Sequence, residues 1–248
     1  MSDIPKLHYF FGRGRAETTR WMLAINQIEF ENVAIKDANM LAELRNSGKL
    51  PFDQMPLLEI DEKNLSQSSA MVRYLARCGN FYGDNNNDAL WCDMIAGVVA
   101  DFAEAAMQAA FQPTRQAVET NLTERFNKFG PCFEQRLISN GSGYCAGKHL
   151  TFADVLLVEA LNSYLEWMPN LLRNFPQLTE LYNRVIDRPG ITNYLKSAER
   201  YPNAGSDYVI DVARVLERKL PAHISNPCLL YTSPSPRDVE ESRMPSSA

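Results

Sequence analysis

The first third of the chain alternates between short apolar runs and segments with apolar residues at helical spacing. This pattern predicts strands at 7–11, 30–35, 55–60 and 64–66, and helices at 16–26, 41–45 and 68–79. Ser68 or Ser69 is expected to cap the last of these helices. A crossover helix between the first two strands implies that they pair in parallel, whereas the last two strands form an antiparallel hairpin. The predicted order is therefore βαβαββα.

From residue 87 onward the strand pattern gives way to helical segments. Helices are predicted over 89–111, 114–139, 155–167, 176–188, 190–198 and 207–218. Gly130-Pro131 is a candidate break in the second of these, because proline removes a helical hydrogen bond. The run from Thr151 to Asp154 has the form of a capping box. The sequence thus predicts an α/β domain over 1–83, a polar linker, and an all-helical domain over 88–220.

Composition narrows the function classes. Of the 248 residues, 45% are apolar and 22% charged, and the net charge is -5. This balance is typical of a globular protein and disfavours nonspecific binding to nucleic acid, which needs many Lys and Arg residues. No stretch approaches the roughly 20 apolar residues of a membrane span, and the N-terminus lacks the apolar core of a signal peptide. We therefore expect no nucleic-acid or membrane partner.

The cysteines indicate a reducing compartment. There are five cysteines, with no CxxC motif and no metal-ligand spacing to the three histidines. An odd, scattered set suggests reduced thiols and a cytoplasmic protein without a metal site.

Residues 228–248 read as an in-frame translation of a transposase-based sequencing adapter. The alternative is a disordered Ser/Pro-rich tail, which composition alone suggests. We exclude this segment from functional reasoning. Residues 219–227 are either native tail or translated untranslated sequence.

Four motifs in order carry a family resemblance. They are Leu7–Glu17 (LHYFFGRGRAE), Phe52–Pro56 (FDQMP), Gln67–Ala70 (QSSA) and Thr151–Asp154 (TFAD). Together they resemble tyrosine-type cytosolic glutathione S-transferases over about residues 6–216. The resemblance is closest to the alpha class, with sigma-like features at 67–69. It implies a thioredoxin-like N-terminal domain followed by a helical bundle, glutathione as co-substrate without a further cofactor, and a homodimer.

The chemistry explains why Tyr9 and Arg15 are the expected catalytic residues. A thiol with a pKa near 8.5 is only a few per cent thiolate at pH 7, yet the thiolate is the nucleophile. Lowering that pKa by about 2 units requires about 2.7 kcal/mol of preferential interaction with the anion. The resemblance assigns Tyr9 as a hydrogen-bond donor to the sulfur. It assigns Arg15, at the start of the first helix, as a source of positive potential.

Other roles follow from the resemblance. Arg45 and Gln54 would hold the glycine end of glutathione. Met55, before an expected cis Pro56, would pair with its cysteinyl backbone. Gln67 and Ser68, at a helix N-terminus, would bind its γ-glutamyl carboxylate. The remaining assignments are Asp101, which would reach the γ-glutamyl amine in the neighbouring subunit, Phe52, an aromatic key in the dimer, and Lys128, which stands where the alpha class has arginine.

The electrophile site is expected to be apolar. Candidates by position are Phe10, Met107, Phe111, Tyr208, Ile210 and Leu216. Met and aromatic side chains suit promiscuous apolar ligands, although helical spacing is equally typical of plain core packing. The last helix resembles the lid helix of the alpha class.

The sequence features bear on three candidate functions. The first is a transferase that conjugates glutathione to apolar electrophiles. Reduction of organic hydroperoxides or isomerisation is an open side activity of this function. The second is a ligand carrier or crystallin-like protein on the same fold. The third, a thiol-disulfide oxidoreductase, requires a cysteine near the first turn, and residues 9–15 contain none.

Overall fold

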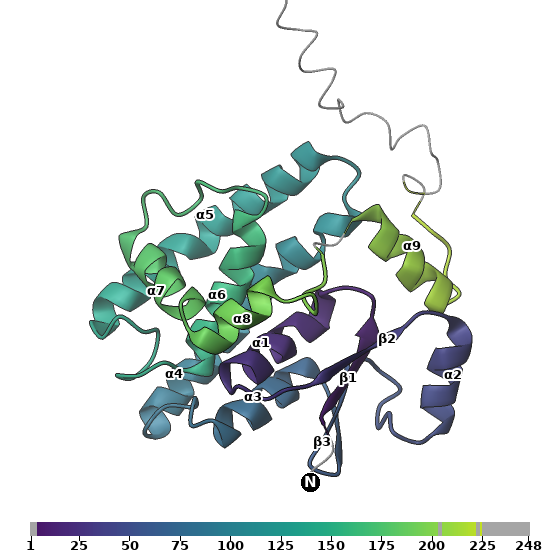
Figure 1. Cartoon of the computed structure of the whole chain (residues 1–248). Helices are drawn as coiled ribbons and strands as arrows, with labels where there is room; N and C mark the ends of the chain where they lie inside the picture. The colour runs from purple at the N-terminus through teal and green to yellow at the C-terminus, as the bar shows by residue number, and fades with distance from the viewer. Residues whose placement is uncertain (1–3, 203–204, 222–223, 225–248) are drawn as a thin grey trace, which may run out of the picture.

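The computed structural model describes residues 4–202, 205–221 and 224. The interpretation of residues 228–248 as adapter sequence lies outside the described residues, as does most of the segment 219–227. Figure 1 shows a small sheet flanked by helices, with a larger group of helices on one side.

A four-stranded mixed sheet forms the first part of the chain. Its strands are β1 (Lys6–Phe10), β2 (Glu31–Ile35), β3 (Leu57–Ile60) and β4 (Lys63–Ser66), in the order β2-β1-β3-β4. β1 pairs in parallel with β2, and Tyr9 lies opposite Ala34. β1 pairs antiparallel with β3, and β3 with β4. The predicted order and pairing directions are confirmed.

Helices cover both faces of the sheet. A short 3₁₀ turn, η1 (Gly14–Ala16), leads into α1 (Glu17–Ile25); the other helices here are α2 (Ala38–Asn46) and α3 (Ser68–Cys78). α1 and α3 pack together on the side of the helical part, and α2 lies across the sheet from them. The buried side chains of α1 and α3 belong to the same hydrophobic core as those of β1 and β3.

The rest of the described chain is helical, as predicted. It contains α4 (Asn86–Met107), η2 (Ala109–Phe111), α5 (Arg115–Asn140), α6 (Phe152–Leu165), α7 (Pro176–Ile186), α8 (Pro189–Lys196) and α9 (Ser206–Val215). α6 is the central helix and packs on α1, α4 and α7. Its capping box is present, because Asp154 accepts a hydrogen bond from the Thr151 backbone at 2.8 Å. Through its packing on α1, α6 joins the helical part to the part that contains the sheet.

Two local predictions are wrong. α5 runs through Gly130-Pro131 without a break; the glycine lies against the Phe126 ring, and its neighbours keep the helix packed. Ser68 is the first residue of α3 rather than its cap. The cap position is Gln67, whose side chain makes no capping hydrogen bond and instead turns to another partner.

The sequence predicts no membrane span, but the segment that contains α4 is long and apolar enough to be one. By length and composition alone, residues 86–111 could cross a bilayer. In the fold, Ile95, Val99 and Phe102 of this segment are buried in the core, and α4 packs against α5 and α6. We therefore interpret the segment as the core helix of a globular protein.

Candidate active site

A cavity of about 370 Å³ opens where the turn after β1 meets the helical part. It is lined from the turn, the start of α3, the C-terminal half of α4, one face of α6, and α9. The sequence-predicted residues that line it are Tyr9, Phe10, Arg15, Ser68, Met107, Phe111 and Tyr208. Pockets of this size with an apolar wall and a few polar groups are typical ligand sites.

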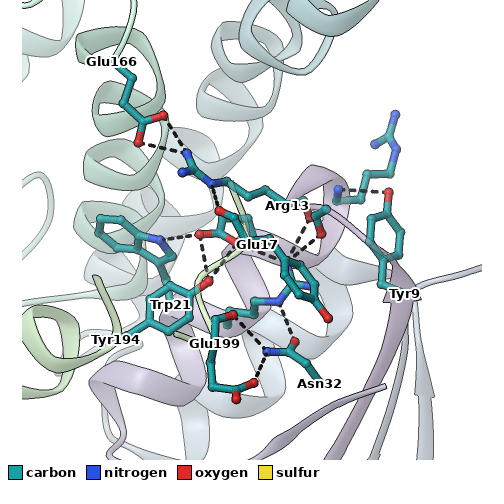
Figure 2. Close-up of polar contacts among 12 residues, drawn as sticks. Tyr9, Arg13, Glu17, Trp21, Asn32, Glu166, Tyr194 and Glu199 are labelled. Carbon is teal, nitrogen blue, oxygen red and sulfur yellow. Dashed lines mark hydrogen bonds and ion pairs between the residues drawn. The ribbon is translucent and has the colours of Figure 1, made fainter. Parts of the chain in front are cut away.

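Tyr9 lies at the end of β1 with 6% of its surface exposed. Its hydroxyl oxygen accepts a hydrogen bond from the Arg15 backbone N–H at 3.2 Å (Figure 2). Because the phenol oxygen accepts this bond and keeps its own proton, Tyr9 can donate to a group bound in the cavity, and a donor on the oxygen makes that proton a stronger hydrogen-bond donor. The Tyr208 hydroxyl is a neighbouring hydrogen-bond partner of the same phenol. The Arg15 side chain is exposed at the cavity wall, where its charge favours an anion.

A buried arginine holds the turn that carries these groups. Arg20 donates to the carbonyl oxygens of Gly12 at 3.1 Å and Arg13 at 3.3 Å. Its side chain is 1% exposed and pairs with Glu17, which is 4% exposed. Figure 2 shows the Glu17 carboxylate between Trp21 and Tyr194, both of which donate to it. This network fixes the turn beneath the cavity.

Arg13 connects the turn to two distant segments. Its guanidinium donates to both carboxylate oxygens of Glu166, at 2.9 and 2.7 Å, and to the Tyr201 carbonyl at 2.8 Å (Figure 2). Glu166 ends α6, and Tyr201 precedes α9. Asn32 of β2 donates to the backbone and side chain of Glu199, both at 3.3 Å, which adds a second attachment of the same segment.

α9 covers the turn. A methyl group on Gly14 would lie 2.7 Å from the Tyr9 hydroxyl and 2.9 Å from the Tyr208 hydroxyl, and one on Gly12 would collide with the Tyr208 ring. Burial, together with the neighbouring Tyr9 phenol, raises the pKa of Tyr208, so this hydroxyl stays protonated. Val212, one helical turn further, also lines the cavity. Ile210 and Leu216 are not among its lining: Ile210 lies off the face that Tyr208 and Val212 share, and Leu216 is the capping residue beyond the end of α9.

A second group of predicted residues does not line the cavity. Gln67 donates to the side-chain carbonyl of Gln54 at 2.7 Å, beside the cavity-lining Ser68. Gln67 has φ 66°, a strained conformation that commonly marks functional sites. Arg45 pairs with Asp53 at 2.5 Å. The expected cis Met55-Pro56 peptide is present, directly before β3.

Comparisons with known proteins identify the family. Residues 5–77 match the model "Glutathione S-transferase, N-terminal domain", and residues 100–198 match "Glutathione S-transferase, C-terminal domain". Glutathione S-transferase alpha-3 of Rattus norvegicus is 39% identical over 206 residues, which is 82% of this chain and 93% of the relative. Glutathione S-transferase A2 of Bos taurus is 37% identical over 223 residues, 88% of this chain and 100% of the relative.

The chain belongs to the glutathione S-transferase family.

Solved structures of the family agree with the fold. A glutathione S-transferase of the hookworm Necator americanus, described as monomeric, matches with a TM-score of 0.70 and 26% identity, covering 80% of this chain and 98% of the hookworm protein. A glutathione S-transferase of Caenorhabditis elegans matches with a TM-score of 0.67 and 28% identity, covering 81% and 99%. The chain thus has the thioredoxin-like N-terminal part and the helical C-terminal part of a glutathione-using transferase. Its curated relatives are of the alpha class.

The remaining predicted residues of this transferase lie on its surface. Asp101 is exposed on α4, and Phe52 is 66% exposed. Lys128 lies over the Phe129 ring at 4.8 Å from the ring centroid. Neither Asp101 nor Phe52 lines the cavity of the described chain.

The four cysteines in the described part of the chain are not among the cavity-lining residues. Cys78 and Cys132 are exposed, and Cys92 and Cys145 are buried. Burial raises the pKa of Cys92 to about 11 and holds that of Cys145 well above its usual value, so both remain thiols. Across residues 4–202, 205–221 and 224, no group of three or more His, Cys, Asp or Glu side chains could hold a metal ion.

Several cavity residues were missed from sequence. They are Arg13, Glu17, Ser69, Glu104, Glu159, Ser163, Trp167 and Val212. A signal existed for those on α6, because 156, 159, 160, 163 and 167 follow helical spacing. Which side of that helix faces the cavity depends on its packing against α1 and α4, which periodicity alone does not give.

Proposed function

We propose that the protein conjugates glutathione to apolar electrophiles, with Tyr9 stabilising the glutathione thiolate. The observation that carries this proposal is the Tyr9 hydroxyl at the cavity wall, with its oxygen occupied by the Arg15 N–H at 3.2 Å. Its proton can then be donated to the sulfur anion. Together with the Arg15 charge, this favours loss of the thiol proton to solvent and leaves the nucleophile in place.

Glutathione would lie along the edge from the cavity to the Gln54–Gln67 pair. Ser68 and Gln67, at the N-terminus of α3, would bind the γ-glutamyl carboxylate. The Met55 backbone would pair with the cysteinyl residue, and Arg45 and Gln54 would hold the glycine end. In a dimer, Asp101 of the other subunit would reach the γ-glutamyl amine.

The electrophile would occupy the apolar side of the cavity. Phe10, Met107, Phe111 and Tyr208 line it, and Val212 extends the same surface along α9. Ile210 and Leu216 remain predictions for a closed state of the last helix. Reduction of organic hydroperoxides or isomerisation would use the same thiolate, and we propose these only as side activities.

We further propose a homodimer in the cytoplasm, without nucleic-acid or membrane partners. Leu90, Met94 and Val98 are four residues apart on α4, and all three are exposed. Phe52 is exposed as well and would insert into the partner as an aromatic anchor. Sedimentation of the wild type and of Phe52→Ala tests this: a dimer that weakens in the variant supports it, and a monomeric wild type contradicts it.

The division into a glutathione-binding domain over 1–83 and a helical domain over 88–220 is part of the proposal. α4 begins with Asn86, directly after the capping residue Asn85, which is consistent with a short linker at this point.

The deciding experiment is conjugation of glutathione to 1-chloro-2,4-dinitrobenzene by the purified chain, wild type against Tyr9→Phe. We expect kcat/KM to fall by about 1–3 kcal/mol in transition-state stabilisation, roughly 5- to 150-fold. Full activity in Tyr9→Phe would remove Tyr9 from the mechanism. Glutathione binding without turnover in the wild type would instead favour the ligand-carrier function.

A further inference from the structure

One face of α6 supplies a wall of the cavity. Leu156, Glu159, Ala160 and Ser163 line it, and Trp167 extends the stripe just beyond the helix. Glu159 is the one ionisable member of this stripe, and only 9% of its surface is exposed. A buried carboxyl group is costly unless it is paired or protonated. Its place in an otherwise mostly apolar wall therefore calls for a chemical role.

Four groups in the described chain face Glu159, and none of them is a cation that pairs with its carboxyl group. They are Glu17 from α1, Arg13 from the glycine turn, Ser163 one turn along α6, and Glu166 at the end of α6. The Arg13 guanidinium is taken by both Glu166 oxygens and by the Tyr201 carbonyl. The Ser163 hydroxyl is the hydrogen-bonding neighbour of the Glu159 carboxyl. Arg13 thus attracts Glu159 only from a distance.

This environment favours the neutral acid. Burial, followed by the nearby Glu17 carboxylate, raises the pKa of Glu159 to about 8. At pH 7 the group therefore carries a proton while it faces the cavity. A buried carboxylic acid with a pKa near the working pH is well suited to general acid catalysis.

We propose that Glu159 donates a proton to the electrophile, which makes the site selective for electrophiles whose oxygen becomes an anion, above all epoxides. This inference rests on the proposed thiolate chemistry at Tyr9. The sulfur forms a bond to one epoxide carbon as the carbon–oxygen bond breaks. The bonding pair goes to the oxygen, which takes the Glu159 proton and becomes a hydroxyl. The carboxylate then regains a proton from solvent.

Aryl halides provide the contrast, since their leaving halide departs as a stable anion and needs no proton. Both reactions use the same glutathione thiolate. The ratio of kcat/KM for an epoxide to kcat/KM for an aryl halide therefore cancels thiolate formation, and the change in this ratio from wild type to variant reports the step at the electrophile.

The test measures this ratio for the full chain with styrene oxide and 1-chloro-2,4-dinitrobenzene. In Glu159→Gln the amide keeps the size of the side chain and can still hydrogen-bond but cannot transfer a proton. We expect the ratio to fall at least about 10-fold, since general acids contribute roughly 10²–10⁴-fold. In the wild type the ratio should decline above pH 8, and in Glu159→Gln it should be flat. The matched control is Glu119→Gln, which changes a surface carboxylate of α5 outside the cavity lining and should leave the ratio unchanged.

Two outcomes would overturn the inference. An unchanged ratio in Glu159→Gln, or equal losses with both substrates, would assign Glu159 a structural role only. A wild type that conjugates neither substrate would overturn the proposed function, and this inference with it. A wild type active on both with an unchanged ratio would overturn this inference alone.

Discussion

The two sides of the cavity are built by different means. On the glutathione side, Tyr9 and Arg15 sit on a turn whose carbonyls are held by Arg20, and the Arg20–Glu17 pair beneath is almost fully buried. On the electrophile side, side chains from α4, α6 and α9 form the wall, and Phe111 is 37% exposed. The position of the glutathione side is fixed by hydrogen bonds to the backbone. The shape of the electrophile side is set by side chains, which substitution can change without breaking such bonds.

This difference in construction matches a difference in task. The glutathione side forms the thiolate that every reaction uses, and the electrophile side contacts the substrate that varies. Every reaction needs the same thiolate at the same point, so its support is a buried polar network with little freedom to vary. Electrophiles differ in shape, and an apolar wall discriminates between them only weakly, by about 1–3 kcal/mol per methylene-sized change. Variants on the two sides should therefore fail in different ways.

The largest effect is expected at Arg20. Arg20→Met would leave the Glu17 carboxylate buried without its cation, and should lower the free energy of unfolding by about 3–5 kcal/mol. Urea unfolding measures this. Arg115→Met is the matched control, because Arg115 pairs with Glu119 at the surface, with side chains 66% and 41% exposed. That change should stay within about 0.5 kcal/mol. Similar losses in both variants would contradict the importance of the buried pair.

Next in size is the effect of a methyl group in the turn. Gly14 has φ +40°, and Gly14→Ala would place a carbon 2.7 Å from the Tyr9 hydroxyl. We expect kcat/KM to fall for every electrophile by about 1–3 kcal/mol, because strain and a displaced phenol affect the shared thiolate. Gly205→Ala, where the added carbon meets open space, is the control. A loss confined to one electrophile would contradict this prediction.

A smaller and selective effect is expected on the opposite side. Phe111→Ala should change kcat/KM unevenly among electrophiles, by about 1 kcal/mol for those large enough to reach the ring. The dissociation constant for glutathione, measured by calorimetry, should stay unchanged. If glutathione binding weakens as much as turnover, then Phe111 supports the turn rather than the electrophile.

The smallest effect is a pH dependence confined to the glutathione side. His8 of β1 lies 2.6 Å from a carboxylate oxygen of Glu59, which also binds Lys49 at 2.6 Å. Burial lowers the pKa of His8 despite its Glu59 partner. Because the unfolded chain then binds the proton more readily, stability should decrease as the pH falls through 6.5 and below.

Glu59 extends the same trend to lower pH. Burial alone would raise its pKa, but the hydrogen bonds from Lys49 and His8 outweigh burial, and the pKa lies below its usual value. The contribution of Glu59 to the free energy of unfolding is fully present above the usual pKa of a carboxyl group. It is lost as the pH falls through the pKa of Glu59 in the folded protein. In His8→Gln, unfolding curves recorded between pH 5 and 7 should depend less on pH. An unaltered dependence would place the proton uptake elsewhere.

Sequence predicted most of the fold, because strand and helix periods are local. Strand pairing, the capping box at Thr151 and the last helix follow from residues close together in the chain. The errors involve tertiary packing. Pro131 stays within α5 because the surrounding helix is held by the core, and Gln67 starts α3 in a strained conformation that no propensity favours.

The site was predicted unevenly for the same reason. Tyr9, Arg15 and Ser68 belong to contiguous motifs, and all three line the cavity. On α9, the predicted Tyr208 lines the cavity together with Val212, one turn further along, whereas Ile210 lies off that face and Leu216 follows the last residue of the helix. Glu159 belongs to a stripe that helical spacing reveals, but its burial beside Glu17 arises only when α1 and α6 pack together, and periodicity alone does not give that packing.

Arg13 makes the turn part of a thermodynamic linkage. Its guanidinium joins the glycine turn to Glu166 in the helical part and to the Tyr201 carbonyl ahead of α9. A ligand that stabilises the turn should therefore shift the equilibrium of the 199–202 segment away from its open state, and by reciprocity the docked segment should tighten binding at the turn. Amide hydrogen exchange in that segment would thus report occupancy of a site to which it contributes no catalytic group.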